Sequence, residues 1–267
     1  MFSAIRLAYK YLKWYWSASN RHGHGVHSPF VYSFIRKVLM DREAVAGADE
    51  IEILRRELLR DKRSVGITEL GAGSLQVKGK QKKISRIAAT SLKPRRYAEL
   101  LARIAKYFNA STILELGTSL GITTIYLSGN SKVYTIEGDP AIAEIASETF
   151  RTIGSNKPGS GPIELFTGDF DGILPTVLQK TGKIDMAYID GNHRLEPTLR
   201  YYDHIRPELS GQGFMVFDDI YWSNEMEQAW NAIKEKPEVT LTIDLFFIGL
   251  VFFDTSFKEK QHFRLRH

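Results

Sequence analysis

The stretch that decides the fold of this chain is ILELGTSLGITT, residues 113–124, a short apolar run followed by a glycine-containing turn. Its first residues predict a buried strand, Gly117 and Gly121 predict a turn, and the residues after Gly121 predict a helix. The next apolar run, KVYTIE, ends in Glu137, which lies 20 residues beyond Gly117. In α/β sheets this offset is typical of a carboxylate that accepts hydrogen bonds from a ribose. The stretch therefore predicts a nucleoside site at the carboxyl ends of parallel strands.

Around this stretch, apolar runs and amphipathic segments alternate from about residue 94 onward. We expect strands at 111–116, 132–137, 163–166, 184–190 and 213–219, each followed by a helix. Strict alternation implies right-handed crossovers and a Rossmann-like, doubly wound α/β sheet that is mostly parallel. Only a short turn separates the last two runs, 239–244 and 248–253, so the last strand is expected to be antiparallel.

The first 90 residues do not follow this alternation. They predict a mainly helical N-terminal cap, residues 1–90, that contacts the substrate or a second subunit. Residues 91–267 are then the cofactor-binding domain, with the boundary near Ser91. A chain of 267 residues is long enough for one large α/β domain with such an appendage.

Composition narrows the class of protein. The absence of cysteine excludes a disulfide scaffold, a zinc–thiolate site and a thiol nucleophile, and it fits a reducing compartment. A net charge of +5 is too small to indicate a nucleic-acid partner. No stretch of about 18 uncharged apolar residues predicts a spanning helix. We therefore expect a cytoplasmic protein, with peripheral membrane contact as the alternative.

The N-terminal segment, MFSAIRLAYKYLKWYWSAS, predicts an amphipathic helix. Arg6, Lys10 and Lys13 recur at helical spacing, while apolar and aromatic residues line another face. The segment lacks the apolar core and the cleavage site of a secretion signal. We expect the helix to pack on its own domain or on a second subunit, which makes a homodimer reasonable. The alternative is that it lies on an anionic membrane surface.

A second glycine-rich stretch, GITELGAGS at residues 66–74, competes for the cofactor. The residues that follow it, SLQVKGKQKK, do not form an amphipathic helix, and the sequence 20 residues further on is basic. It also fails as a phosphate-binding loop, because five residues rather than four separate Gly73 from Gly79 and because Gln81 follows Lys80 where Ser or Thr is needed. We interpret this stretch as a turn in the cap.

Two further clusters in the first 96 residues carry functional alternatives. The basic cluster comprises Lys78, Lys80, Lys82, Lys83, Arg86, Lys93, Arg95 and Arg96. It is by default a solvated face, and the functional hypothesis is a positive edge of the acceptor site that suits an anionic acceptor or headgroup. His22, His24 and His27 lie among glycines, but no acid or cysteine accompanies them. A turn or interface is therefore favoured over a transition-metal site.

The motifs of the main domain resemble those of a known superfamily. Dinucleotide dehydrogenases also use an acid at this offset, but the loop GTSLG has Ser119 where their fingerprint has glycine. The order of ILELGTSLGITT, TIEGD, TGDF and AYIDGNH resembles the class I S-adenosylmethionine-dependent methyltransferases, over roughly residues 93–253. Within that superfamily the chain looks most like the catechol O-methyltransferase-like, metal-dependent O-methyltransferases.

The resemblance implies S-adenosyl-L-methionine as the cofactor. It places Gly117, Ser119 and Thr123 beside the methionine moiety, Glu137 at the ribose hydroxyls, and Asp169–Phe170 beside the adenine. The full set of predicted cofactor-binding residues is Glu115, Gly117, Ser119, Gly121, Thr123, Glu137, Asp169, Phe170 and Asp190.

Three acids follow neighbouring strands of the predicted sheet. Asp190 ends one predicted strand, and Asp218 and Asp219 end the next, so we expect their side chains to converge. Three close carboxylates repel one another unless a cation lies between them, and a hard divalent cation such as Mg²⁺ prefers oxygen ligands. The metal-dependent methyltransferases hold an ion with a similar pattern, although they often have Asn at the third position. The alternative is that Asp218 or Asp219 is a loop or capping residue and that Asp190 only orients other groups.

His193 and Asp190 are the predicted catalytic residues. His193 lies three residues after Asp190 in DGNH, and imidazole titrates near neutrality, which suits a general base that deprotonates an acceptor hydroxyl. The catechol enzymes have a lysine near this point. The alternatives for His193 are a cap of the helix near Pro197 and a metal ligand.

The sequence thus predicts an S-adenosylmethionine-dependent O-methyltransferase for a small hydroxylated acceptor, anionic or aromatic, assisted by a divalent metal ion. A metal-independent methyltransferase with a sugar, amine or RNA acceptor is one alternative. No nucleic acid is expected, because no RNA-binding module flanks the domain. The other alternative is a membrane-surface or partner-binding protein with a degenerate nucleoside site.

Overall fold

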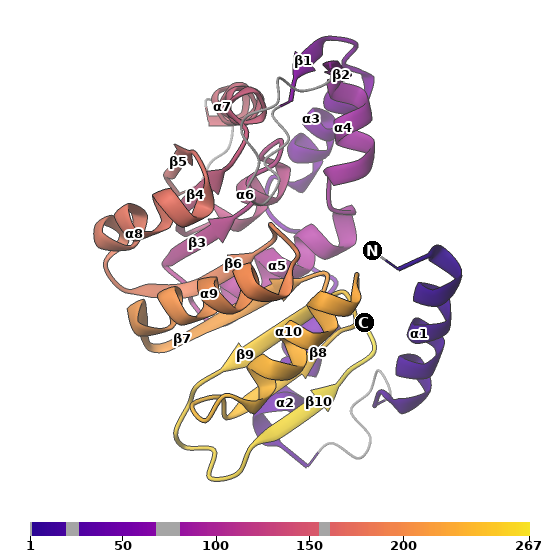
Figure 1. The fold of residues 1–267 in the computed structure, drawn as a ribbon, viewed down its shortest axis with the longest axis vertical. Coiled ribbons are helices and arrows are strands. Elements are labelled where there is room, and N and C mark those ends of the chain that lie inside the picture. The colour runs from indigo at the N-terminus through magenta and orange to yellow at the C-terminus, as the bar shows by residue number, and fades with distance from the viewer. Residues whose placement is uncertain (1, 20–26, 68–80, 155–160) are drawn as a thin grey trace. The chain divides into compact units, whose positions relative to one another are not determined.

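The computed structural model describes residues 2–19, 27–67, 81–154 and 161–267 (Figure 1). The chain divides into two compact units, which are described separately below. One comprises Met1–Arg42 and Lys183–His267, and the other comprises Glu43–Gly182. Among the described residues, the helices are too short or too polar for any of them to cross a membrane.

The unit Glu43–Gly182 has three parallel strands with helical connections. Its helices are α3 (Ala48–Arg60), α4 (Ile84–Ser91), α5 (Arg95–Tyr107), α6 (Ile122–Leu127), α7 (Pro140–Gly154) and α8 (Phe170–Thr181). Its strands are β1 (Ser64–Gly66), β2 (Gln81–Lys83), β3 (Thr112–Leu116), β4 (Lys132–Glu137) and β5 (Ile163–Thr167). Strand β4 lies between β3 and β5 and pairs with both in parallel, while β1 and β2 form a separate antiparallel pair. Helices α6 and α7 make the crossovers that parallel strands require.

Local sequence explains why these elements form. Pro94 precedes α5 and fixes the backbone at its start, and the apolar face of α5 puts Leu100, Leu101 and Ile104 in the core. Helix α6 begins after Gly121, whose φ of 84° lies in the left-handed region that favours glycine. A Cβ atom at this position would lie 2.5 Å from Cε1 of Phe150, so both the conformation and the packing require glycine.

The cap helices of this unit share one core with the helix that follows the glycine loop. Ile51 of α3 and Ile84 and Ile87 of α4 belong to the same apolar cluster as Ile122 and Ile125 of α6. Helix α6 is therefore held by side chains from the N-terminal part of the chain.

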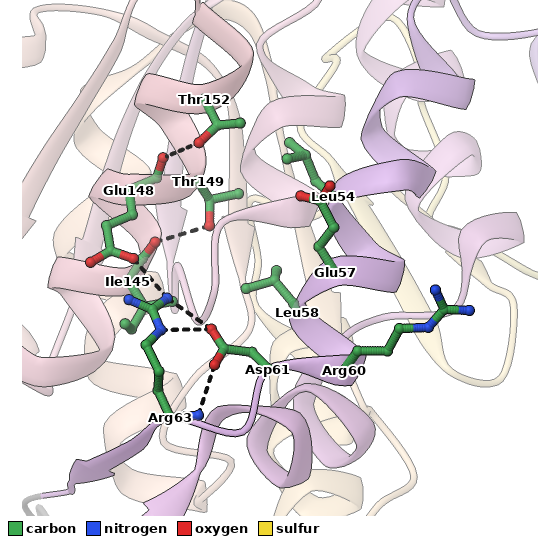
Figure 2. Close-up of a pocket in the computed structure, with 10 residues that line it drawn as sticks. All are labelled: Leu54, Glu57, Leu58, Arg60, Asp61, Arg63, Ile145, Glu148, Thr149 and Thr152. Carbon is green, nitrogen blue, oxygen red and sulfur yellow. Dashed lines mark hydrogen bonds and ion pairs between the residues drawn. The ribbon is translucent and has the colours of Figure 1, made fainter.

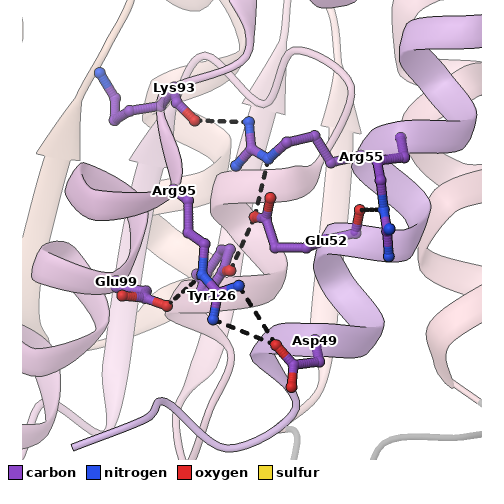
Figure 3. Close-up of polar contacts among 8 residues, drawn as sticks. Asp49, Glu52, Arg55, Lys93, Arg95, Glu99 and Tyr126 are labelled. Atoms are coloured by element: carbon purple, nitrogen blue, oxygen red, sulfur yellow. Dashed lines mark hydrogen bonds and ion pairs between the residues drawn. The ribbon is translucent and has the colours of Figure 1, made fainter. Parts of the chain in front are cut away.

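A buried polar network also connects α3 to α6 (Figure 3). Arg55 Nε donates to Glu52 Oε1 at 2.9 Å, and Arg55 Nη1 donates to the Lys93 carbonyl at 2.7 Å. Tyr126 of α6 donates its hydroxyl to the same Glu52 oxygen at 3.0 Å. Burial, together with the negative charge of Glu52, raises the pKa of Tyr126, so the phenol stays protonated and acts as a donor.

The other unit has a mixed sheet. Its helices are α1 (Ala4–Ser17), α2 (Pro29–Phe34), the π-helical turn η1 (Ile35–Leu39), α9 (Leu195–Ile205), the 3₁₀ turn η2 (Arg206–Glu208) and α10 (Asn224–Glu235). Its strands are β6 (Ile184–Ile189), β7 (Leu209–Asp218), β8 (Leu241–Asp244), β9 (Ile248–Phe252) and β10 (Gln261–Arg264). Strands β6 and β7 are parallel, β9 is antiparallel to both β7 and β8, and β10 is parallel to β8.

The predicted fold class is confirmed: a Rossmann-like, mostly parallel arrangement with an N-terminal helix. The run 248–253, predicted as an antiparallel strand, is β9. Strand β10 is an addition that sequence reasoning missed. Its four residues alternate between exposed and half-buried positions, so no apolar run marks them.

Helix α1 packs on its own unit. Trp14 is buried against Phe246, and its Nε1 donates to Asp244 Oδ1 at 2.8 Å. Tyr221 donates its hydroxyl to Asp244 Oδ2 at 2.7 Å. Burial raises the pKa of Asp244, while these donors and the backbone N–H of Phe246 act in the opposite direction.

Some sequence interpretations fall outside the described residues or are untested. The turn predicted at 66–74 lies largely within 68–80, as do Lys78 and Lys80, and His22 and His24 lie within 20–26. The predicted division into 1–90 and 91–267 concerns functional roles and stays a prediction. By their contacts, residues 43–90 group with β3, β4 and β5.

Candidate functional site

Three strand ends place the central predicted cofactor residues at one edge of the unit Glu43–Gly182. Leu116 pairs with Ile136, so Gly117 and Glu137 follow neighbouring positions on β3 and β4. Glu137 pairs with Thr167 on β5, so Asp169 lies two residues beyond its partner. The carboxyl ends of parallel strands are where open α/β sheets bind ligands. The predicted cofactor residues Gly117, Glu137 and Asp169 thus lie along one continuous edge formed by β3, β4 and β5.

Glu137 holds the glycine loop directly. Its Oε2 accepts a hydrogen bond from the Ser119 N–H at 2.8 Å, and its Oε1 accepts one from the Asp139 N–H at 3.0 Å. Burial raises the pKa of Glu137, and the two N–H donors lower it in part. Each carboxylate oxygen can accept a second hydrogen bond, which leaves acceptor capacity for a pair of hydroxyl groups such as a ribose diol.

The loop between β3 and α6 carries three residues in the left-handed region. Gly117 has φ 102°, Ser119 has φ 50°, and Gly121 has φ 84°. For Ser119 this conformation costs about 1–2 kcal/mol relative to glycine. The left-handed backbone explains why the common fingerprint has glycine at this position, where this chain has Ser119. The Ser119 hydroxyl donates to Ser91 Oγ at 2.9 Å, so the end of α4 contacts the loop.

Glu115 supports the loop from inside the core. It is fully buried, and its Oε2 accepts hydrogen bonds from the hydroxyls of Thr124 at 2.5 Å and Thr135 at 2.7 Å. The Thr118 and Thr135 hydroxyls lie 2.6 Å apart and extend the network to the loop. Glu115 thus fixes α6 to β3 and β4, while its predicted contact with the cofactor stays a prediction. The predicted ligand Thr123 lies half-buried in the first turn of α6.

The predicted adenine residues lie at the start of α8. Asp169 is exposed and is the N-cap of the helix, because its side chain accepts a hydrogen bond from the Gly172 N–H at 3.3 Å. Phe170 follows as a half-buried first helical residue. The register of β4 and β5 sets both residues beside Glu137 at the same edge, and their contact with adenine stays a prediction.

The other unit has an edge of its own, where the predicted catalytic residue Asp190 and the predicted metal ligands Asp218 and Asp219 lie. Ile189 of β6 pairs with Phe217 of β7, so Asp190 follows β6 next to Asp218, the last residue of β7. Tyr188 donates its hydroxyl to Asp190 Oδ2 at 2.8 Å. His193 Nε2 lies 3.6 Å from Asp190 Oδ1. The two predicted catalytic residues are therefore brought together.

A tight turn carries the chain from Asp190 to His193. Asn192 has φ 60°, which reverses the backbone, and its Nδ2 donates to the Tyr201 hydroxyl of α9 at 2.9 Å. This hydrogen bond positions the turn on a helix. His193 is half-buried. It does not cap α9, whose N-cap is Arg194.

The predicted metal site is not formed by the side chains as they stand. Asp218 is buried, with 2% of its surface exposed, and Asp219 has φ 53° and accepts the Trp222 N–H with its carbonyl at 2.9 Å. No group of three or more histidine, aspartate or glutamate side chains in the described part of the chain has an arrangement that holds a metal ion. The structure therefore does not show the predicted metal site of Asp190, Asp218 and Asp219, and no chemical step below depends on a metal ion.

Two residues at these edges were not singled out from the sequence. Tyr188 lies two residues before Asp190 and so shares a face of the strand, which is a signal that could have identified it. Ser91 contacts Ser119 across 28 residues of sequence, a distance at which no local pattern predicts a contact.

The predicted basic cluster is only partly a free charged surface. Arg95 Nε donates to Glu99 Oε1 at 2.7 Å, and an Arg95 guanidinium nitrogen lies 3.4 Å from Asp49 Oδ1 (Figure 3). Lys82, Lys83 and Arg86 are exposed near and on α4. Arg96, at the start of α5, is exposed as well.

A hollow of about 390 Å³ lies between α3 and α7 (Figure 2). Arg63 is one of the residues that line it, with Nη2 at 2.8 Å from Asp61 Oδ2 and 2.9 Å from Glu148 Oε2. The hydrogen bond with Arg63 lowers the pKa of Asp61. Helix α7 starts near the carboxyl end of β4, so its last turns, which line the hollow, lie toward the opposite end of the strands. The hollow is therefore distinct from the predicted cofactor edge.

Comparison with protein families gives one match to the main domain. Residues 114–220 match a sequence profile described as "Methyltransferase domain". A catechol O-methyltransferase of Niastella koreensis is 29% identical over 129 residues, which are 46% of this chain and 54% of that protein. An uncharacterised protein of Acanthamoeba polyphaga mimivirus is 27% identical over 143 residues, 50% of this chain and 65% of that protein. The chain thus spans roughly half to two thirds of these curated relatives.

Solved structures confirm the fold. An O-methyltransferase from Bacillus cereus in complex with SAH has a TM-score of 0.53 at 17% identity, covering 84% of this chain and 97% of that one. The O-methyltransferase TomG from Streptomyces achromogenes in complex with SAM has a TM-score of 0.51 at 20% identity, covering 61% and 82%. The predicted resemblance to S-adenosylmethionine-dependent methyltransferases is confirmed by the profile and the fold together.

Proposed function

Given that residues 114–220 match a methyltransferase domain, we propose that this protein is an S-adenosyl-L-methionine-dependent O-methyltransferase for a small hydroxylated acceptor. The observation that carries the proposal is the position of Glu137. Its carboxylate lies at the end of β4, is bound to the Ser119 N–H of the glycine loop, and keeps acceptor capacity for a diol. The matched relatives include a catechol O-methyltransferase, which favours a hydroxyl oxygen as the acceptor.

The residues at the edge of β3, β4 and β5 fit the cofactor. The left-handed backbone at Gly117 and Gly121 lets a ligand approach the main chain closely, and Glu137 accepts from ribose hydroxyls. Asp169 and Phe170, which follow β5 at the same edge, would border the adenine. When bound, the cofactor would supply an electrophilic methyl group on a sulfonium, which passes in line to the acceptor oxygen while the sulfur leaves as a neutral thioether.

His193 and Asp190 prepare the acceptor. A neutral imidazole of His193 takes the proton of the acceptor hydroxyl, because an oxygen anion is the stronger nucleophile. Asp190 lies 3.6 Å from His193 Nε2, so the carboxylate stabilises the imidazolium that results. The hydroxyl of Tyr188 keeps Asp190 in place. Removal of the proton from the acceptor and its transfer to His193 thus need only groups that the chain provides.

The acceptor is proposed to be aromatic or anionic. Helix α4 ends at Ser91, which contacts the glycine loop, and Arg86 on the same helix is exposed, as are Lys82 and Lys83 just before it. Positive charge next to a site raises the local concentration of anionic substrates.

A replacement of His193 tests the assignment of the base. We expect His193→Gln to lower kcat by about 10²–10⁴-fold, the usual contribution of a general base. The affinity for S-adenosylhomocysteine, measured by calorimetry, should not change, because His193 does not belong to the cofactor edge. His204→Gln, on the exposed side of α9, is the matched control.

Two outcomes would contradict the proposal. Absence of S-adenosylhomocysteine binding by the wild type would exclude every methyltransferase, whereas binding without activity on phenols, catechols, sugars and amines would favour a degenerate nucleoside site. An assay with and without EDTA then separates metal-dependent from metal-independent transfer.

A further inference from the structure

We propose that helix α1 docks this protein on an anionic lipid surface. The inference concerns a surface of the unit that contains α1, and it does not depend on the methyltransferase activity. Helix α1 runs from Ala4 to Ser17, and its two faces have different environments.

One face of α1 is fixed to the protein. Trp14 is buried and donates its indole N–H to Asp244, and Lys10 Nζ lies 2.6 Å from Glu227 Oε2. The residue before the helix cap, Phe2, donates its backbone N–H to the Trp222 carbonyl at 2.9 Å. Because buried and charge-paired groups hold it along its length, α1 has a defined orientation rather than free rotation.

The opposite face of α1 is an exposed apolar stripe. It consists of Ile5, Tyr9, Leu12 and Trp16, with 84%, 68%, 55% and 81% of their surfaces exposed. Spacings of four, three and four residues set these side chains on one side of a helix. Exposed single apolar residues are ordinary, but four large ones in one row, two of them aromatic, indicate an interaction surface.

The charges around the stripe favour lipid over protein. Arg6 and Lys13 are exposed on the same helix, and the first 40 residues of the chain contain no aspartate or glutamate. Pairing of α1 with α1 of a second copy would bring these positive charges together, which is unfavourable. An anionic membrane instead attracts them, and each basic residue near such a surface contributes roughly 1 kcal/mol.

The chemistry of the stripe matches the boundary between lipid headgroups and acyl chains. Tyr and Trp have an apolar ring and a polar atom, and they concentrate at that boundary. A helix of 14 residues is about 21 Å long and lies in the plane of the interface with its apolar face submerged. On the opposite face of α1, the contacts of Trp14 with Asp244 and of Lys10 with Glu227 stay on the protein side.

Flotation of the full chain with vesicles tests this proposal. We expect binding to vesicles of phosphatidylcholine that contain about 30% phosphatidylserine, as a mimic of an anionic leaflet. Binding to pure phosphatidylcholine should be weaker. High salt should abolish binding to the anionic vesicles.

Leu12→Gln combined with Trp16→Gln should also abolish binding to the anionic vesicles. Arg6→Gln combined with Lys13→Gln should weaken vesicle binding by about 20- to 30-fold, since two contributions of roughly 1 kcal/mol add up to about 2 kcal/mol. The fluorescence of exposed Trp16 should shift to the blue on binding.

The controls separate lipid docking from misfolding and from self-association. Ile53→Gln with Leu59→Gln removes two exposed apolar residues from α3 and should bind vesicles like the wild type. Each variant should have the same circular dichroism spectrum and the same urea-unfolding midpoint as the wild type, which shows that the fold is intact. Equal binding to neutral and anionic vesicles, or none at low salt, overturns the proposal. A dimer in solution that the Leu12/Trp16 variant dissociates overturns it in favour of a second copy.

Discussion

Glu137 combines two roles in a single carboxylate. Its oxygens accept the N–H groups of Ser119 and Asp139, so the side chain shapes the loop before any ligand is present. Burial raises its pKa, which means that the ionised form is kept at some cost and is stabilised by each further donor. Two ribose hydroxyls are donors of this kind.

Replacement of Glu137 should weaken cofactor binding strongly. We expect Glu137→Gln to bind S-adenosylhomocysteine about 10- to 100-fold less tightly, because hydrogen bonds to charged groups contribute about 1.5–3 kcal/mol. Calorimetry measures this change, and Glu144→Gln, on the exposed side of α7, is the control.

The same residue predicts the direction of the pH dependence. The free carboxyl has a pKa above the ordinary 4.5, and the bound ribose favours the ionised form. Binding must therefore expel a proton at pH values below the raised pKa, and affinity falls by up to about tenfold per pH unit as the solution is acidified through that range. Glu137→Gln should lose this dependence; a wild-type affinity that is constant from neutral pH down to 4.5 contradicts the assigned role.

Gly121 and Gly172 form a matched pair for testing backbone constraints. Gly121→Ala introduces a Cβ 2.5 Å from Phe150 at φ 84°, and we expect it to lower the free energy of unfolding by about 1–3 kcal/mol or more. Gly172 lies in helix α8, and a Cβ atom added there would meet no other atom within 4 Å, so Gly172→Ala should raise stability by about 0.5–1 kcal/mol. Urea unfolding measures both, and equal effects would refute the steric account.

At the scale of elements, α3 is one of the cap helices that share a core with α6. Its apolar face shares the core of α6, and its Glu52 accepts from both Arg55 and Tyr126 (Figure 3). Since α6 begins at the end of the glycine loop, the cap supports the cofactor edge without contributing a ligand through this network. The network can therefore affect cofactor binding although none of its residues is predicted to contact the cofactor.

Removal of the buried cation should loosen this connection. We expect Arg55→Met to lower the free energy of unfolding by about 2–4 kcal/mol, because Glu52 is left largely buried without its charge partner. Arg56→Met, one residue along the same helix but exposed, should change stability by less than about 0.5 kcal/mol. Thermal unfolding compares the two; similar losses would show that the Arg55 interaction has no special weight.

At the scale of the whole molecule, the proposed functions belong to different parts of the chain. The cofactor edge lies in the unit Glu43–Gly182, whereas the catalytic pair Asp190 and His193 and the lipid-docking helix α1 belong to the other unit. Vesicle binding and cofactor binding should therefore fail independently in the variants described above.

The sequence by itself determined the order of strands and helices and the edge at which the cofactor residues lie. These follow from local rules: apolar runs form the strands, glycine permits the loop after β3, and the carboxyl ends of parallel strands share one edge. Glu137 was identified for that reason, and the register of β3, β4 and β5 then confirmed its place beside Gly117 and Asp169.

Only the tertiary structure decided which partner each polar side chain has. Ser91 with Ser119, Tyr188 with Asp190, and Trp14 with Asp244 are contacts that no spacing rule predicts in full. The metal site expected from three acids at neighbouring strand ends was not found among the described residues, because register fixes where the backbones meet but not the directions of Asp190, Asp218 and Asp219. Side-chain direction depends on burial and on competing hydrogen bonds, and both are set only when distant segments come together.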